Sequence, residues 1–287
     1  MRSEEQVLKK ILDFAQNDEN IRAVVINGSR VNPNVKHDIF CDYDMICFVH
    51  DIEKYVGGQS WIQSFGDLVI MQFNRHDDFP DDHFVFLMQF ADGVRIDLSF
   101  AKMKMISSSL EDSLTVVLLD KDHCIPPVPA PNESSYITKK PDQAEYDLMV
   151  NEFWWVSTYV AKALWRNETV TAKYLFEVIV RDCLNRMVTW YVAMQHGWQI
   201  NGGKMGKKFG KLLPPDLWQE LLSTYPGIEE EDIWQALFRA GMLMRKLSIL
   251  VAEDLGYSYH YQEDERVTAY LQHVMNLPKD AQSFDGN

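Results

Sequence analysis

The chain has 287 residues, 46% of them hydrophobic, and a formal net charge of −14 at pH 7. This length allows one or two domains with a sizeable core, and the acidic charge argues against nucleic acid as a partner, because phosphate contacts need a basic surface. The sequence lacks the run of about 18 apolar residues that a membrane helix needs, and its start is too acidic for a secretory signal, so we expect a cytoplasmic protein with no membrane partner.

An amphipathic helix is predicted at about residues 3–17, and an apolar, β-branched run at residues 21–27 predicts a buried strand. Gly28 and Ser29 end this strand in a turn. Glycine lets the backbone approach a phosphate closely, and the Ser29 N–H and hydroxyl can donate hydrogen bonds to it. Arg30 could pair with a phosphate oxygen. A Gly-Ser pair alone usually marks only a turn, so its meaning depends on the residues that follow.

Two acids, Asp42 and Asp44, stand at the start of the next strand-like run, residues 42–49. Side chains at i and i+2 of a strand point to the same face. Carboxylates held this close repel each other, and a bound divalent cation commonly neutralises that repulsion. Hard oxygen ligands suit Mg²⁺, which often takes its remaining ligands from water and substrate phosphates. The pair therefore predicts a magnesium site.

A third acid, Asp97, lies in a predicted hairpin whose strands span residues 84–90 and 94–100. The Asp-Gly pair between them suits a hairpin turn. Asp97 lies on the strand face opposite the apolar one, so the three acids converge if Asp42 and Asp44 share that face. From its strand position, Asp97 could be the general base that accepts a hydroxyl proton or a third metal ligand.

The chain divides near residue 130, where four prolines in residues 126–131 predict a stiff linker. Residues 1–130 predict an α/β domain with a mixed sheet, and further strands are expected at residues 67–73 and 115–119. Residues 131–287 predict an all-α helical domain. Its expected helices span residues 142–166, 171–196, 217–225, 233–255 and 263–277.

A glycine-punctuated stretch at residues 202–211 holds the clearest basic cluster, Lys204, Lys207, Lys208 and Lys211. One interpretation is a clamp for the triphosphate of a nucleotide. A solvated basic loop is about as good an explanation.

Glu145 and Glu152 lie near one face of the predicted helix 142–166, with Trp155 close to it. Carboxylates beside an aromatic surface suit a cationic sugar, and the net charge points the same way. The alternative is a surface pair of glutamates over a tryptophan core. Asp182 lies among apolar residues of the next helix, so we expect it to be buried and either to bind substrate or to pair with Arg181, Arg186 or another helix.

Taken together, Gly28-Ser29, the Asp42-x-Asp44 pair and a distant acid on a hairpin strand resemble the nucleotidyltransferase superfamily that includes DNA polymerase β. The longer segments 27–34 and 36–44 and the tryptophan-rich segment 151–156 resemble the aminoglycoside 6-adenylyltransferases over nearly the whole chain. The resemblance implies Mg²⁺-dependent transfer of AMP from ATP to a hydroxyl at the 6-position of the streptidine ring of streptomycin, with release of pyrophosphate and inactivation of the antibiotic.

Two alternatives stay open. One is an enzyme of the same fold that acts on a different acceptor, and the other is a non-catalytic protein that binds nucleotide. The three acids argue against the second, because binding alone does not require a third carboxylate. The sequence is compatible with a monomer or a small homo-oligomer.

Overall fold

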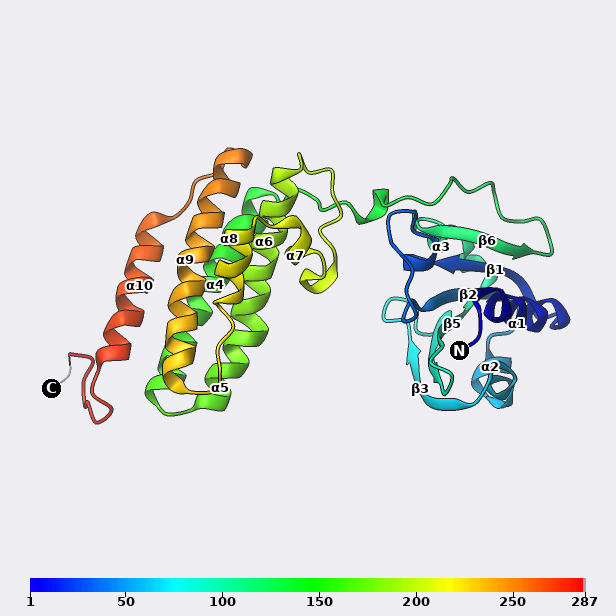
Figure 1. The fold of residues 1–287 in the computed structure, drawn as a ribbon, viewed down its shortest axis with the longest axis horizontal. Helices are drawn as coiled ribbons and strands as arrows, with labels where there is room; N and C mark the ends of the chain where they lie inside the picture. Colours follow the sequence, from blue (N-terminus) through cyan, green and yellow to red (C-terminus); the bar gives the residue numbers. More distant parts are fainter. Residues whose placement is uncertain (286–287) are drawn as a thin grey trace. The chain divides into compact units, whose positions relative to one another are not determined.

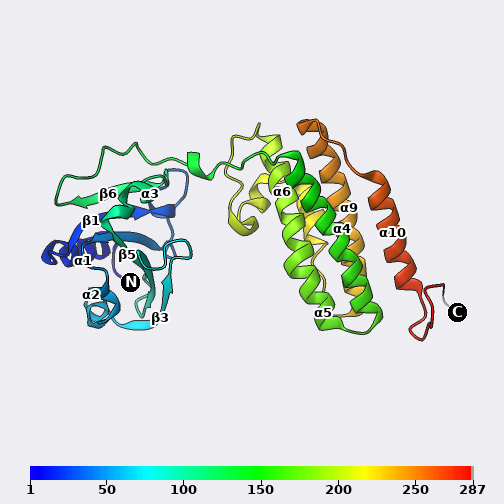
Figure 2. The same ribbon diagram turned by 180° about the vertical axis from the view of Figure 1, so that it is seen from behind.

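The computed structural model describes residues 1–285, and the chain forms two compact units, Met1–Ser135 and Tyr136–Asn287 (Figures 1 and 2). The division falls slightly beyond the predicted position near residue 130. Among the described residues, no helix combines the length and the apolar character needed to cross a membrane.

The first unit is built on a mixed six-stranded sheet of order β3-β4-β5-β2-β1-β6, which confirms the predicted α/β class. β2 and β5 are parallel, and the other neighbouring pairs are antiparallel. The strands are β1 (Ile21–Asn27), β2 (Tyr43–Val49), β3 (Leu68–Arg75), β4 (His83–Phe90), β5 (Arg95–Lys102) and β6 (Thr115–Asp120). The short helices of this unit are α2 (Glu53–Val56) and α3 (Ile106–Ser109), with 3-10 turns η1 (Gly28–Val31), η2 (Ser60–Phe65) and η3 (Met103–Met105).

Helix α1 (Glu4–Asn17) begins at a capping box in which Ser3 and Gln6 satisfy each other's backbone N–H groups. It buries Val7, Ile11 and Ala15 against the sheet face that carries the alternate apolar residues of β4 and β5. Phe84 and Phe100 are among those residues and are at most 1% exposed. Because strand side chains alternate between faces, this burial directs Asp97 to the opposite face. That face carries a smaller apolar cluster.

The second unit is helical, as predicted (Figure 1). Its helices are α4 (Gln143–Trp165), α5 (Thr169–Tyr174), α6 (Arg181–Gln195), α7 (Phe209–Leu212), α8 (Pro215–Leu222), α9 (Glu230–Leu255) and α10 (Tyr261–Asn276), with the 3-10 turn η6 (Lys204–Gly206). A further 3-10 turn, η4 (Ser134–Tyr136), spans the division of the chain. The expected continuous helix at 171–196 is interrupted: a π-helical segment, η5 (Leu175–Val180), joins α5 to α6. A π-turn places one extra residue in a helix and turns the side chains that follow, and such turns are frequent at functional sites.

Candidate active site

The turn after β1 brings the backbone of Gly28 against the carboxylate of Asp44. Gly28 has φ +77, and its N–H donates to the carbonyl oxygen of Leu114 at 3.1 Å. A Cβ atom added at Gly28 would lie 2.5 Å from Asp44 Oδ2. Glycine is therefore required twice at this position, once for the left-handed backbone and once for the closeness of the carboxylate.

Asp44 and Asp97 are neighbours across the parallel pair of strands, because β2 and β5 pair with Asp44 opposite Asp97. Side chains at one register position of adjacent strands point to the same face of the sheet. Asp42 lies two residues before Asp44, at the entrance to β2. The strand register thus brings three acids from two distant segments to one end of one sheet face.

The guanidinium of Arg95 joins these acids. It donates to both carboxylate oxygens of Asp97, from Nε at 2.9 Å and from Nη2 at 2.7 Å, and its Nη1 lies 3.6 Å from Asp42 Oδ2. The Asp97 contact, together with the charges of Asp42 and Asp44, raises the pKa of Arg95. Sequence reasoning did not select Arg95 as a site residue, although its position on the same strand face as Asp97 was a usable signal.

Arg30 is almost covered, with 8% of its side chain exposed. Its Nη1 pairs with Glu4 at 2.9 Å, its Nε donates to the Asp42 carbonyl at 3.1 Å, and its guanidinium stacks 3.7 Å from the centre of the Tyr43 ring. Nη2 also donates to the carbonyl of Cys41. These contacts fix the loop that delivers Asp42 to the site. The predicted contact of Arg30 with a phosphate stays a prediction.

Ser29, the neighbour of Arg30, is tied to the same loop. Its Oγ lies 3.3 Å from Cys41 Sγ, so the turn after β1 and the segment before β2 are connected by side chains as well as by the sheet.

The donor set at this end of the sheet fits Mg²⁺ in kind. Within residues 1–285, no three His, Cys, Asp or Glu side chains form a group that could hold a metal ion by themselves. Asp42 and Asp44 supply hard carboxylate oxygens from one strand start, and Mg²⁺ is commonly held by one or two carboxylates together with water and substrate phosphates. Asp97 is held by the Arg95 guanidinium through both carboxylate oxygens.

In the second unit, three of the predicted substrate residues line one cavity of about 410 Å³. Glu145 and Glu152 come from α4, two helical turns apart, and Asp182 comes from the first turn of α6. Residues of the π-helical segment complete the wall that leads to Asp182. We call this space, lined by Glu145, Glu152 and Asp182, the acidic cavity.

One cation shares the acidic cavity with its three acids. Arg186 Nη2 pairs with Glu145 Oε1 at 2.9 Å, and both side chains are about half exposed. Within the described part of the chain, neither Glu152 nor Asp182 has an ion-pair partner. Burial raises the pKa of the neighbouring Cys183 thiol to about 12, and the charges of Asp182 and Glu152 add to that shift. The cavity is therefore electronegative and suits a cationic ligand.

Two expectations for this region are corrected by the structure. Asp182 is exposed and not buried, and the buried residue is its neighbour Arg181, whose guanidinium bonds to Thr224 and Glu177. The π-turn just before α6 was not foreseen, and it changes which side chains face inwards. Trp155 does not line the acidic cavity; it is 55% exposed, and its Nε1 donates to Tyr159 Oη at 2.9 Å.

The lysine stretch forms an ordered loop followed by α7. Gly203, Met205 and Gly206 all have positive φ, and Met205 is fully exposed. Lys204, Lys207 and Lys211 are exposed, whereas Lys208 is half-buried and donates from Nζ to the Asn201 carbonyl at 3.1 Å. Three of the four lysines are thus exposed, two in the loop and Lys211 in α7, and their contact with a triphosphate stays a prediction.

The chain is similar to known adenylyltransferases over most of its length. A family model described as "Streptomycin adenylyltransferase" matches residues 1–274. The "Aminoglycoside 6-adenylyltransferase" of Bacillus subtilis (strain 168) is 39% identical over 282 residues, which cover 96% of this chain and 98% of the relative. The protein of the same name from Campylobacter jejuni is 36% identical over 277 residues, with coverage of 94% and 95%. A solved structure, "Crystal structure of an aminoglycoside 6-adenyltransferase from Bacillus subtilis", is 35% identical, covers 96% of this chain and 100% of its own, and gives a TM-score of 0.49.

Proposed function

The chain belongs to the streptomycin adenylyltransferase family and is a nucleotidyltransferase, and we propose that it transfers AMP from ATP to a hydroxyl group of streptomycin. By likeness to relatives named as 6-adenylyltransferases, the hydroxyl would be the one at the 6-position of the streptidine ring. The observation that carries the proposal is the pairing of Asp44 with Asp97 beside the Gly28 turn.

In the proposed reaction, the hydroxyl oxygen of the drug attacks the α-phosphorus of ATP. The bond from that phosphorus to the oxygen bridging the α- and β-phosphates breaks, and pyrophosphate leaves. Mg²⁺ held by Asp42 and Asp44 would supply positive charge against the phosphates and the leaving group. Gly28 has no side chain, so its backbone could approach a phosphate closely, and the Ser29 N–H could donate to that phosphate, as could the Ser29 hydroxyl in place of its contact with Cys41.

Asp97 would take the hydroxyl proton. Its carboxylate side chain is 13% exposed and held through two hydrogen bonds by Arg95, so its orientation is fixed before substrate arrives. A positioned general base of this kind typically contributes about 10²–10⁴-fold to a rate. The choice of base over third metal ligand rests on this fixed orientation and on the family pattern.

The acidic cavity would hold the cationic part of the aminoglycoside. Glu152 and Asp182 can accept charge-assisted hydrogen bonds from guanidinium groups, and Glu145 can exchange Arg186 for a ligand cation. A volume of about 410 Å³ lies in the range typical of small-molecule sites. An acceptor of a different kind, such as an anionic or apolar one, is disfavoured by this lining.

The experiment is to measure pyrophosphate release from ATP and Mg²⁺ with and without streptomycin, and then the mass of the drug. Streptomycin-dependent release with a mass gain of one adenylyl group would support the proposal. If pyrophosphate is released with another cationic aminoglycoside and not with streptomycin, the proposed reaction would stand and the proposed substrate would be wrong. Nucleotide binding without release for any acceptor would favour the non-catalytic alternative.

A further inference from the structure

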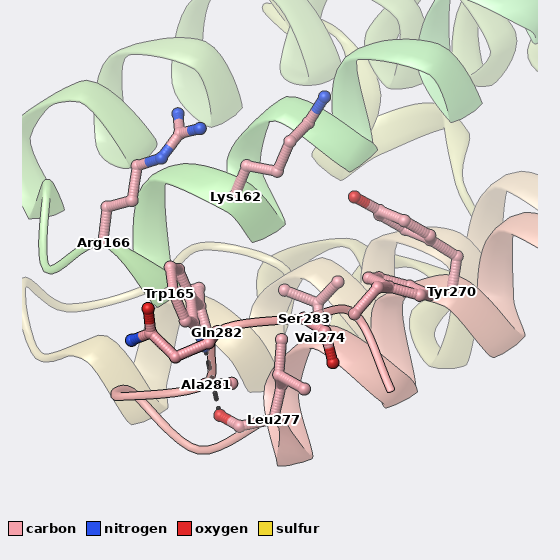
Figure 3. A pocket seen from close by; sticks show the side chains of 10 residues that line it. Lys162, Trp165, Arg166, Tyr270, Val274, Leu277, Ala281, Gln282 and Ser283 are labelled. Atoms are coloured by element: carbon pink, nitrogen blue, oxygen red, sulfur yellow. Dashed lines mark hydrogen bonds between the residues drawn. The ribbon is translucent and has the colours of Figure 1, made fainter. Parts of the chain in front are cut away.

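A second cavity, of about 300 Å³, lies at the C-terminal end of α4 (Figure 3). It is bounded by α4, by α10 and by the segment that follows α10, residues 277–284, which we call the tail. Trp165, Tyr270, Val274 and Phe284 give it a largely aromatic and apolar lining. We call this space the tail cavity.

The tail is folded back over the helices by specific contacts. Trp165 Nε1 donates to the carbonyls of Leu277 and Pro278, each at 3.2 Å. Lys279 Nζ donates to the Leu164 carbonyl at 2.8 Å. The Phe284 ring stacks on Tyr270, with centroids 5.5 Å apart and an angle of 16° between the planes. Because both ends of the tail are held by these contacts, the tail forms a fixed wall of the cavity.

Two cations lie on the other side. Lys162 and Arg166 stand one helical turn apart at the end of α4, and Figure 3 shows both extending from that helix. No acidic residue lines the tail cavity, and within residues 1–285 neither cation has a carboxylate at ion-pair distance. Burial raises the pKa of Tyr270, and the positive charge of Arg166 opposes that shift.

Cations at the last turn of a helix complement its dipole, and that effect explains why basic residues suit this position. It does not explain the aromatic hollow beside them. Lys162 Nζ lies 4.6 Å from the centre of the Tyr159 ring, an aromatic contact that leaves the charge un-neutralised by any carboxylate of residues 1–285. Two such positive charges at the edge of an aromatic cavity are complementary to an aromatic ring that carries a negative group.

The tail cavity is distinct from the acidic cavity, because Lys162 lies ten residues beyond Glu152 on α4, or about 15 Å along the axis. The two cavities also have opposite charge. A cationic aminoglycoside suits the first and is repelled by the second.

We propose that the tail cavity is a binding site for a small aromatic anion, a planar ring with a carboxylate or phosphate group. The ring would lie between Trp165 and Tyr270, and the anionic group would meet Lys162 and Arg166. A volume of about 300 Å³ is at the lower end for small-molecule sites and limits the ligand to one small ring system. The site is independent of the proposed transfer reaction, since it uses none of the residues assigned to it.

The test measures binding to the full chain by calorimetry and by ligand-observed NMR, with two probes. Indole-3-acetate represents the carboxylates and phenyl phosphate the phosphates, and neutral 3-methylindole is the control that reports on apolar binding alone. The double variant Lys162→Met/Arg166→Met removes both charges and keeps helix-forming side chains. The matched control is Lys139→Met, which removes an exposed lysine elsewhere in the same unit.

We expect at least one anionic probe to bind, with a dissociation constant at least tenfold higher in the double variant, which corresponds to about 1.4 kcal/mol. Lys139→Met should bind as the wild type does, and streptomycin-dependent pyrophosphate release should be the same in all three proteins. Binding of only one probe identifies the anionic group. The proposal is overturned if neither probe shows binding that the double variant weakens, or if 3-methylindole binds as tightly as indole-3-acetate.

Discussion

Replacing Gly28 with alanine tests how closely the turn after β1 is fitted to Asp44. The new Cβ would lie 2.5 Å from Asp44 Oδ2, where ordinary contact begins at 3.4 Å, so the carboxylate must move by about 1 Å. A shift of that size at a reacting centre costs about 100-fold in rate. The left-handed backbone, φ +77, adds about 1–2 kcal/mol of strain for any residue with a side chain.

The assay for Gly28→Ala combines streptomycin-dependent pyrophosphate release with urea unfolding. Two control variants separate the effects. Gly197→Ala carries the backbone strain alone, because Gly197 has φ +60 and no atom within 4 Å of an added Cβ. Gly58→Ala carries neither effect. We expect a rate loss of about 100-fold only for Gly28→Ala. A Gly28→Ala enzyme within threefold of the wild-type rate would refute the fitted-turn reasoning.

Arg95→Gln should lower the melting temperature by about 2–4 °C without Mg²⁺, because the acids lose their shared cation, and Mg²⁺ should restore much of that loss. The control is Arg75→Gln, which loses an exposed ion pair at 3.6 Å and the contact of its guanidinium with the Phe84 ring. Its change in melting temperature should be the same with and without Mg²⁺. Glu152→Gln should raise KM for streptomycin about tenfold at similar kcat, because it removes one charge-assisted hydrogen bond to the drug. The control Asp216→Asn, on the exposed side of α8, should leave KM unchanged. Burial lowers the pKa of His83 from its ordinary value of 6.5 to about 4, so on acidification the unfolded chain takes up a proton on this imidazole before the folded chain does. The free energy of unfolding should therefore fall by about 2 kcal/mol between pH 7 and pH 5. A His83→Gln protein that loses as much would show that other groups are responsible.

Local patterns predicted the elements of the sheet well. The alternation of apolar and polar residues in β4 and β5 predicted both strands and placed Asp97 on the polar face. This works because a sheet with one buried face requires apolar side chains at every second residue. The pairing of Asp44 with Asp97 is a choice of strand order, and a single sequence does not contain it. The structure therefore adds the neighbour relation that brings the acids together.

In the helical unit, sequence patterns did not predict every feature of the helices. A π-turn has no residue signature, because packing against other helices decides where the extra residue is taken up. Hence the exposure of Asp182 could not be read from its apolar neighbours. Trp155 lies three residues after Glu152, which rotates it by about 60° from that side chain, and this suffices to take it out of the acidic cavity.

For Arg95 and Arg30, the sequence does not predict the hydrogen-bond partners. Both are visible as cations next to motif residues, but the sequence cannot say which acceptor each one meets. Arg95 bonds to the predicted base, and Arg30 bonds to Glu4 and to the loop carbonyls before β2. Long side chains reach several partners, so only the fold decides among them.

The most direct test of the central claim is a comparison of Asp97→Asn with the wild type and with Asp78→Asn, an exposed loop acid in the same unit. Pyrophosphate release, the mass of the drug and ATP binding would be measured for each protein. If AMP is transferred with Asp97 as the base, Asp97→Asn should bind ATP with wild-type affinity but modify streptomycin at least about 100-fold more slowly. Asp78→Asn should be unaffected in both measurements. An Asp97→Asn protein that still adenylylates the drug at the wild-type rate would contradict the account.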